Sequence, residues 1–346
     1  MRRLVIVIPD LYLPRGLRGA PLQAAAFAQV PGLEQVARFG TRAQLQGGWR
    51  NWLLGFTGRS DLAGIAPACI AAAALAARPG TGRPQDSTAW IATALHLQAG
   101  IATVHLEHGG LLRLPPTEQA ELAAKFTDTF GVSGCALTPL PAGEFLLETP
   151  GIIPIATAEP ERCVGGAPDQ LVPVAAGAAP LRRLLSEIEM WLHAQPLNEK
   201  RRGRGAPPLS ALWPWGAIGR IVRPEPRASS RAALAFGRDA WLEGLSRLQG
   251  NECLELPERL EVALGAAAQA SVLVAEVGGE VQMNRGGVAE AMSRLDARYV
   301  APALQALRSG ALDEISVILN DAHLQLQRAS LRRFWRRAAS GLTGFA

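Results

Sequence analysis

Lysine is almost absent from this sequence of 346 residues, because only two of its 35 basic residues, Lys125 and Lys200, are lysines. Arginine this dominant, beside so much alanine and glycine, is typical of a GC-rich genome rather than of a nucleic-acid-binding surface. The net charge of +5 therefore bears on solubility and loose association, and it does not indicate a fold.

Long apolar runs and closely spaced cysteines are also missing. The longest nearly apolar stretch, residues 65–77, contains Pro67 and is shorter than the roughly 20 residues that a membrane span needs. The four cysteines have no short spacing, which excludes a zinc motif and a disulfide framework. The apolar run after Arg2 and Arg3 stops at Pro9, too early for a signal peptide. We expect a cytoplasmic protein without a membrane span.

Short β-branched runs predict strands that are buried on both faces, as in a parallel sheet. They lie at 4–8, 271–275 and 315–319. Each run ends in polar or acidic residues, and open α/β sheets place their binding sites at the carboxyl ends of their strands. The alternative interpretation is that any strand is followed by a polar loop. The apolar content of 48% is ample for a core.

Helical periodicity accompanies these strands. Apolar residues recur at helical spacing over 180–194 and over 288–309, where Pro302 predicts a kink and Gly310 a cap. The strand–helix–strand order over 271–319 predicts a βαβ unit with parallel strands. The sequence thus indicates an α/β protein with a mostly parallel sheet and flanking helices.

The stretch from about residue 95 to residue 147 has a different pattern, which predicts a small inserted α+β subdomain. Its expected elements are a hairpin of 101–106 and 111–114, a helix capped by Thr117 that ends before Gly131, and strands at 135–137 and 144–147. We therefore expect a core of 1–94 and 171–346, with residues 95–170 as the inserted subdomain and loops.

The most unusual segment combines arginines with tryptophans. Clustered arginines bind phosphate or carboxylate, and Trp faces hold planar or cationic groups. The alternative is a solvated basic loop beside two tryptophans of the core. The candidate binding residues are Asn198, Arg201, Arg202 and Arg204, followed by Trp213, Trp215 and Gly216.

This segment, from Asn198 to Gly219, resembles the Asn-x-x-Arg…Trp-x-Trp-Gly-x-Gly signature of the bacterial Rpf E-type regulatory proteins, with Gly216 and Gly219 three residues apart here. That family is similar to archaeal-type cofactor-independent phosphoglycerate mutases of the alkaline phosphatase superfamily. Both ends of the chain agree with the resemblance, in the first strand with its acidic Asp10 and in the last helix and strand. The resemblance implies an alkaline phosphatase-like α/β fold and a cytoplasmic regulatory role.

The metal ligands depart from the enzyme pattern. Enzymes of that superfamily hold two metals with several Asp and His residues, whereas this chain has only five histidines and separates Asp321 from His323 by one residue. The residues thus predict a degenerate site and no resident cofactor. The open alternative is one divalent ion, Mn or Zn, held by Asp10, Asp321 and His323.

The degenerate metal site and the arginine cluster favour a non-catalytic protein that binds a small phosphorylated or carboxylated anion, and the resemblance implies that its role is regulatory. Arg201, Arg202 and Arg204 would hold the anion, Asn198 would orient it, and Trp213, Trp215 and Gly216 would form the wall. One alternative is a divergent metal-dependent phosphotransferase or phosphatase. Another is a nucleic-acid-associated regulator that acts through the Arg-rich segment 328–337. The sequence names no protein partner.

Overall fold

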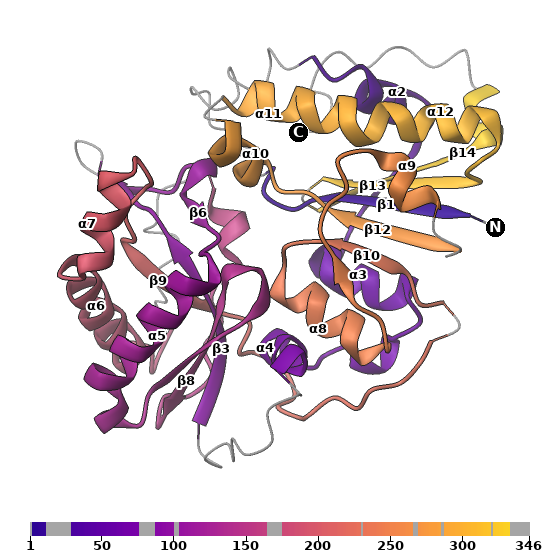
Figure 1. The fold of residues 1–346 in the computed structure, drawn as a ribbon. Coiled ribbons are helices and arrows are strands. Elements are labelled where there is room, and N and C mark those ends of the chain that lie inside the picture. The colour runs from indigo at the N-terminus through magenta and orange to yellow at the C-terminus, as the bar shows by residue number, and fades with distance from the viewer. Residues whose placement is uncertain are drawn as a thin grey trace. The chain divides into compact units, whose positions relative to one another are not determined.

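Two compact units make up the chain (Figure 1). The computed structural model describes residues 2–11, 29–75, 87–99, 104–164, 175–229, 231–265, 269–284, 287–319 and 321–332. The first unit takes residues 1–63, 228–237 and 251–346, and the second takes 64–227 and 238–250. The second unit is larger than the inserted subdomain of 95–170 that we expected, because it includes elements that we had assigned to the core of 1–94 and 171–346.

The described part of the first unit contains a seven-stranded sheet in which five neighbouring strands are parallel. The last two strands, β14 and β2, are antiparallel to their neighbours. The predicted strands are confirmed as adjacent and parallel, and the α/β class with a mostly parallel sheet is confirmed with them. In sheet order the strands are β11 (Cys253–Leu254), β10 (Leu234–Gly237), β12 (Ala270–Val274), β1 (Arg3–Ile8), β13 (Glu314–Leu319), β14 (Ala322–Gln327) and β2 (Thr41–Gln44).

Both faces of this sheet are covered by helices. Alternate residues Leu4, Ile6 and Ile8 pack into one core together with apolar side chains of the helices along that face. Figure 1 shows these helices above the sheet. On the opposite face, the guanidinium of Arg3 lies 4.5 Å from the ring of Phe56 in α3. The helices of this unit are α2 (Pro31–Phe39), α3 (Gly48–Phe56), α9 (Leu260–Gly265), α10 (Val277–Asn284), α11 (Val288–Leu295) and α12 (Ala301–Ser309).

The long helix predicted over 288–309 is present, with a widened turn in the middle. A π-helical turn, Asp296–Val300, joins α11 to α12, whose second residue is Pro302, and the Ala301 N–H bonds to the Asp296 carbonyl five residues back. This turn takes the place of the predicted kink, since proline disturbs the regular ladder of hydrogen bonds. Gly310 ends the helix at a φ of 86°, as predicted.

An antiparallel sheet forms the centre of the second unit. In the residues described there, β3 pairs with β8 and β6 along one edge and with β9 along the other, and β7 extends the sheet beyond β8. A two-stranded ladder of β4 and β5 lies apart from it. The strands are β3 (Ser87–Leu95), β4 (Gln98–Ala99), β5 (Val104–His105), β6 (Leu111–Leu112), β7 (Ala136–Pro139), β8 (Phe145–Pro150) and β9 (Ala211–Trp215).

The hairpin predicted from 101–106 and 111–114 is wrong. Leu111–Leu112 pairs with the end of β3 and Val104–His105 with β4, because the tertiary pairing outcompetes the local turn; residues 101–103 lie outside the described residues. The two strands predicted after the helix are confirmed as the pair β7 and β8.

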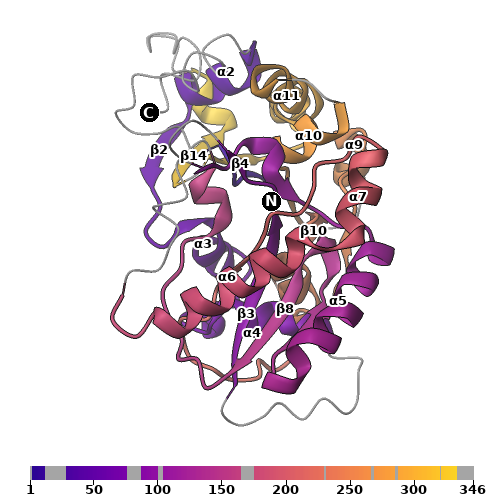
Figure 2. The same cartoon turned by 90° about the vertical axis from the view of Figure 1, so that its left-hand side faces the viewer.

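Helices cover both faces of this second sheet as well. Helices α5 and α6 lie along one face (Figure 2), where their apolar side chains pack on the sheet, while α4 and α8 lie on the other face (Figure 1). The predicted helix 117–130 is confirmed, but it begins at Pro116, so Thr117 lies inside its first turn and does not cap it. The helices are α4 (Pro67–Ala72), α5 (Pro116–Phe130), α6 (Ala179–His193), α7 (Pro196–Gly203) and α8 (Ala240–Leu248).

Short 3-10 turns complete the described elements of the two units. They are Ser60–Leu62, Ala73–Leu75, His108–Gly110, Gly131–Ser133, Pro141–Gly143, Pro160–Cys163 and Arg328–Arg332. None of the helices in the described ranges has both the length and the apolar character that crossing a membrane requires.

Gly244 tests the close packing of α8 against α4. A methyl group at Gly244 would collide with the backbone carbonyl of Ile70, whereas one at Gly203 would meet nothing within 4 Å. We expect Gly244→Ala to lower the free energy of unfolding by about 1–3 kcal/mol, measured by urea denaturation. Gly203→Ala in the same unit is the control and should move the urea midpoint little. Equal midpoints for the two variants would contradict this packing.

Candidate functional site

The carboxyl ends of β1, β12 and β13 meet at one edge of the parallel sheet, where the sequence placed its candidate metal ligands. Asp10 follows β1 there and is completely buried. Its two carboxylate oxygens accept hydrogen bonds from the backbone N–H groups of Val277 (2.8 Å) and Gly278 (2.6 Å). These amides begin α10, so Asp10 satisfies the exposed donors and the positive end of a helix.

The other two candidate ligands are held in different ways. His323 lies on β14 with its Nε2 3.0 Å from the Ser316 hydroxyl and its ring 4.8 Å from that of Trp52. Burial lowers the pKa of His323, which keeps the imidazole neutral near pH 7. Half-buried Asp321 follows β13, and its backbone carbonyl accepts the Leu45 N–H at 2.7 Å.

A divalent ion does not fit this donor set. In the part of the chain that the structure describes, no three His, Cys, Asp or Glu side chains gather as metal ligands, so Asp10, Asp321 and His323 do not form one site. Glu280, another buried carboxylate near this edge, accepts hydrogen bonds from Arg298 (2.9 Å) and Asn284 (3.0 Å). The carboxylates of Asp10 and Glu280 therefore serve internal hydrogen bonds at this edge of the sheet.

The predicted arginine loop is a helix instead. Residues 196–203 form α7, which begins at Pro196, because proline suits the first helical position and the following residues are good helix formers. Buried Asn198 donates hydrogen bonds to the carbonyls of Leu192 (2.9 Å) and Leu209 (3.0 Å) and accepts the Leu209 N–H at 2.7 Å. Its amide thus fastens α6, α7 and the segment before β9 together, with no hydrogen left for a ligand.

Most of the basic side chains at this helix are paired with acids of α5. Arg201 and Arg204 both bind the buried carboxylate of Glu118, and Lys200 binds Glu121 at 3.0 Å. Arg201 also donates to the Pro207 carbonyl at 2.7 Å. Burial lowers the pKa of Arg201, and the Glu118 carboxylate compensates for its lost hydration. Three of the four basic side chains at α7 therefore form ion pairs within the protein.

The two tryptophans do not face the arginines. Trp213 and Trp215 alternate along β9 with Leu212, which packs on the α5–α6 side of the sheet, so both indoles lie on the opposite face. The indole N–H of Trp213 bonds to the Ala158 carbonyl at 2.9 Å and that of Trp215 to the Thr93 hydroxyl at 3.0 Å. The predicted alternative of two core tryptophans describes them well.

Gly216 directly follows β9 and has a geometric role. Its φ of 76° lies in the left-handed region, and a Cβ there would stand 3.0 Å from that of Pro67 in α4. The structure therefore does not bring Gly216, Trp213 and Trp215 together with the basic residues of α7.

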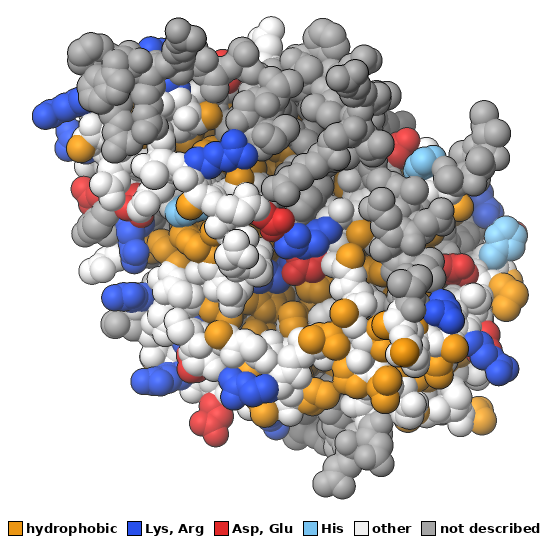
Figure 3. Space-filling view, turned by 180° about the vertical axis from the view of Figure 1, so that it is seen from behind, with side chains coloured by type: hydrophobic (Ala, Val, Ile, Leu, Met, Phe, Trp, Pro, Cys, Tyr) orange, Lys and Arg blue, Asp and Glu red, His pale blue; other side chains and the backbone are white. Residues whose placement is uncertain are grey.

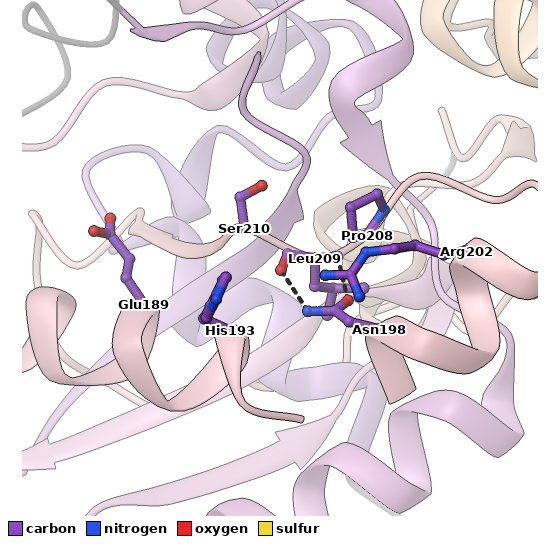
Figure 4. A pocket seen from close by; sticks show the side chains of 7 residues that line it. All are labelled: Glu189, His193, Asn198, Arg202, Pro208, Leu209 and Ser210. Carbon is purple, nitrogen blue, oxygen red and sulfur yellow. Dashed lines mark hydrogen bonds between the residues drawn. The ribbon is translucent and has the colours of Figure 1, made fainter. Parts of the chain in front are cut away.

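A cavity of about 160 Å³ lies where the end of α6 meets α7 and the segment that leads into β9 (Figure 4). We call it the α6–α7 cavity. Two of the predicted ligand-binding residues, Asn198 and Arg202, belong to its lining. It is lined by Glu189, His193, Asn198, Arg202, Pro208, Leu209 and Ser210.

Three ionisable groups of this lining have no internal partner. Among the residues described, no hydrogen bond or ion pair engages the side chains of Glu189, His193 or Arg202. The Ser210 hydroxyl, in contrast, accepts the Leu97 N–H at 3.1 Å. Desolvation by the surrounding protein raises the pKa of Glu189. Glu189 and His193 were not among the predicted site residues, although their spacing of four residues on a predicted helix places them on one face.

Only the beginning of the Arg-rich segment 328–337 belongs to the described residues. Arg328–Arg332 forms a 3-10 turn, and the remaining residues of the predicted basic helix, 333–337, lie outside the described residues. On the face drawn in Figure 3, the described Lys and Arg side chains are scattered among acidic and apolar ones and form no continuous basic field. The nucleic-acid alternative stays a prediction.

Comparison with known proteins finds a distant similarity that extends over most of the chain. No family model and no curated protein matches it. The cofactor-independent phosphoglycerate mutase from Thermoplasma acidophilum aligns with 94% of this chain and 90% of its own, at 15% identity and a TM-score of 0.39. The PH0037 protein from Pyrococcus horikoshii aligns with 94% of this chain and 87% of its own, at 14% identity and a TM-score of 0.44. No residue role follows from likeness of this degree, and the regulatory-family resemblance stays a prediction.

Substitutions at Asp10 test whether this carboxylate at the sheet edge has a structural role. We expect Asp10→Ala to lower the free energy of unfolding by about 1–3 kcal/mol, because it strands two buried N–H groups. Asp10→Asn, whose amide keeps one acceptor oxygen, should lose less, as measured by urea denaturation. An Asp10→Ala protein of unchanged stability that has lost a bound metal would reverse this assignment.

A substitution at Asn198 distinguishes a structural role of its amide from a role in ligand binding. Asn198→Ala should destabilise the second unit by about 2–4 kcal/mol, because three buried hydrogen bonds disappear together. Gln195→Ala, which removes one hydrogen bond from half-buried Gln195 to Trp191, is the comparison and should shift the thermal midpoint much less. Loss of anion binding at unchanged stability would show that Asn198 serves the ligand instead.

Proposed function

We propose that this chain is a non-catalytic regulatory protein that binds a small anionic ligand in the α6–α7 cavity. The observation that carries the proposal is the state of Arg202. In the described residues its guanidinium has no partner, while the neighbouring Lys200, Arg201 and Arg204 are bound to carboxylates. An arginine left unpaired at a concave surface is suited to a carboxylate or phosphate, because its planar fork of donors matches those groups.

The chemistry around the cavity supports binding over turnover. His193 could accept or donate a proton, but it has no partner that would orient it, as a general base requires. At the sheet edge, Asp10 is occupied by the amides of α10 and His323 by Ser316. Phosphoryl transfer through two metals needs several free ligands, so these contacts favour a scaffold that has kept its fold and lost its chemistry.

The regulatory part of the proposal comes from the family resemblance of the sequence. A phosphoglycerate mutase-like scaffold with a regulatory role in the cytoplasm is what that family resemblance implies. A small metabolite that occupies the cavity would then act as the signal. Divergent metal-dependent phosphoryl transfer is the competing outcome of the experiment below.

Titration with inorganic phosphate and with 3-phosphoglycerate, followed by calorimetry, tests the proposal. We expect binding at the α6–α7 cavity, and Arg202→Gln should weaken it about 10- to 100-fold because a charge-assisted contact is lost. Arg183→Gln is the matched control, since Arg183 is an exposed arginine of α6 that pairs with Glu187. Its affinity should equal that of the unchanged protein.

A parallel assay addresses catalysis directly. The purified protein is analysed for bound metals and tested on model phosphoesters with added manganese or zinc. We expect no turnover. Stoichiometric metal that is lost in Asp321→Ala, together with turnover, would establish a phosphotransferase, and the absence of any anion binding would remove the ligand from the proposal.

A further inference from the structure

The α6–α7 cavity carries charges of both signs at its two ends. Figure 4 shows Glu189 on one side of the lining and Arg202 on the other, with His193 between them. Glu189 and His193 lie four residues apart on α6, and Arg202 comes from α7. The cavity is therefore dipolar, and its chemistry selects ligands more narrowly than a basic patch would.

The two charged groups do not neutralise each other. Among the described residues, neither Glu189 nor Arg202 takes part in an ion pair or a side-chain hydrogen bond. A ligand with only negative charge would gain from Arg202 but would be repelled by the Glu189 carboxylate. A ligand that also carries a donor would satisfy both ends.

The rest of the lining limits both the size of the ligand and the polar groups that it can contact. Leu209 and Pro208 contribute apolar surface, and the Pro208 carbonyl already lies 2.9 Å from the His96 ring. The Ser210 hydroxyl is bound to the backbone of Leu97. With about 160 Å³ of space, the polar groups that remain for a ligand are those of Glu189, His193 and Arg202.

We infer that the ligand is a small carboxylic acid that carries an amino or hydroxyl donor, with its carboxylate on Arg202 and its donor on Glu189. This inference rests on the proposed function, because it names the ligand class of the same cavity. An amino acid and a hydroxy acid share the required chemistry, and the experiment distinguishes them.

Propionate, L-lactate and L-alanine form a matched series, because they differ only in the hydrogen, hydroxyl or ammonium on the α-carbon. Ligand-detected NMR titrations with these three acids should give affinities about tenfold higher for lactate or alanine than for propionate, one hydrogen bond to a charged group being worth that much. A preference for alanine indicates an amino acid, and a preference for lactate a hydroxy acid.

Variants assign the preference to Glu189. Glu189→Gln should remove most of the advantage of lactate or alanine over propionate, while Arg202→Gln should weaken the binding of all three acids. Glu187→Gln is the control on the same helix, since Glu187 is paired with Arg183. Urea midpoints of the variants show that each is folded.

The outcomes separate this inference from the proposed function. If propionate binds as well as lactate and alanine, or if Glu189→Gln changes no ratio, the inference is overturned. The proposed function then still stands where phosphate or propionate binding depends on Arg202. If none of the three acids nor inorganic phosphate binds, both are overturned.

Discussion

Helices in both units begin on buried carboxylates, and much of the architecture depends on this interaction. Asp10 receives the first amides of α10, and Asp296 accepts hydrogen bonds from Gly32 and Leu33 at the start of α2. In the second unit, Asp239 caps α8 through the Leu242 N–H. A buried charge requires such donors, and the helix supplies them together with its favourable dipole. Each carboxylate thereby fixes where a helix begins against its sheet.

The same interaction explains why acidic residues at the sheet edge are poor evidence of catalysis here. Asp10 has the position expected of a catalytic or metal-binding carboxylate, at the end of a central parallel strand. Its two oxygens are nevertheless bound by backbone amides at 2.8 and 2.6 Å. Displacing them for a metal would leave the start of α10 unsatisfied inside the protein, which is costly. Position in a fold and availability for chemistry are separate properties, and only contacts reveal the second.

Much of the fold could be predicted because its signals are local. Continuous β-branched runs indicated the central strands, and helical periodicity found α5, α6 and the pair α11 and α12 within a few residues. The hairpin around Gly109 failed, because β6 pairs with β3 across 17 residues, Leu95 to Leu111. Such pairing is decided by the packed sheet and leaves no local pattern. The extent of the second unit was missed for the same reason.

The candidate site was less predictable than the fold, because it depends on which charges cancel. The sequence showed Arg201, Arg202 and Arg204 as equivalent members of one cluster. Glu118 and Glu121 lie about 80 residues earlier, and no spacing rule connects them with α7. Only the packing of α5 against α7 shows that these acids engage the neighbours of Arg202.

Once these ion pairs are accounted for, a small set of ionisable side chains without partners among the described residues remains in the α6–α7 cavity. Arginine is so common in this chain that one unpaired arginine on an open surface would signify little. Arg202 differs because it shares a cavity with Glu189 and His193, two further ionisable groups without described partners. Every residue of that lining belongs to the second unit, whereas the predicted metal ligands belong to the first. Binding at the cavity can therefore be tested independently of any metal chemistry at the sheet edge.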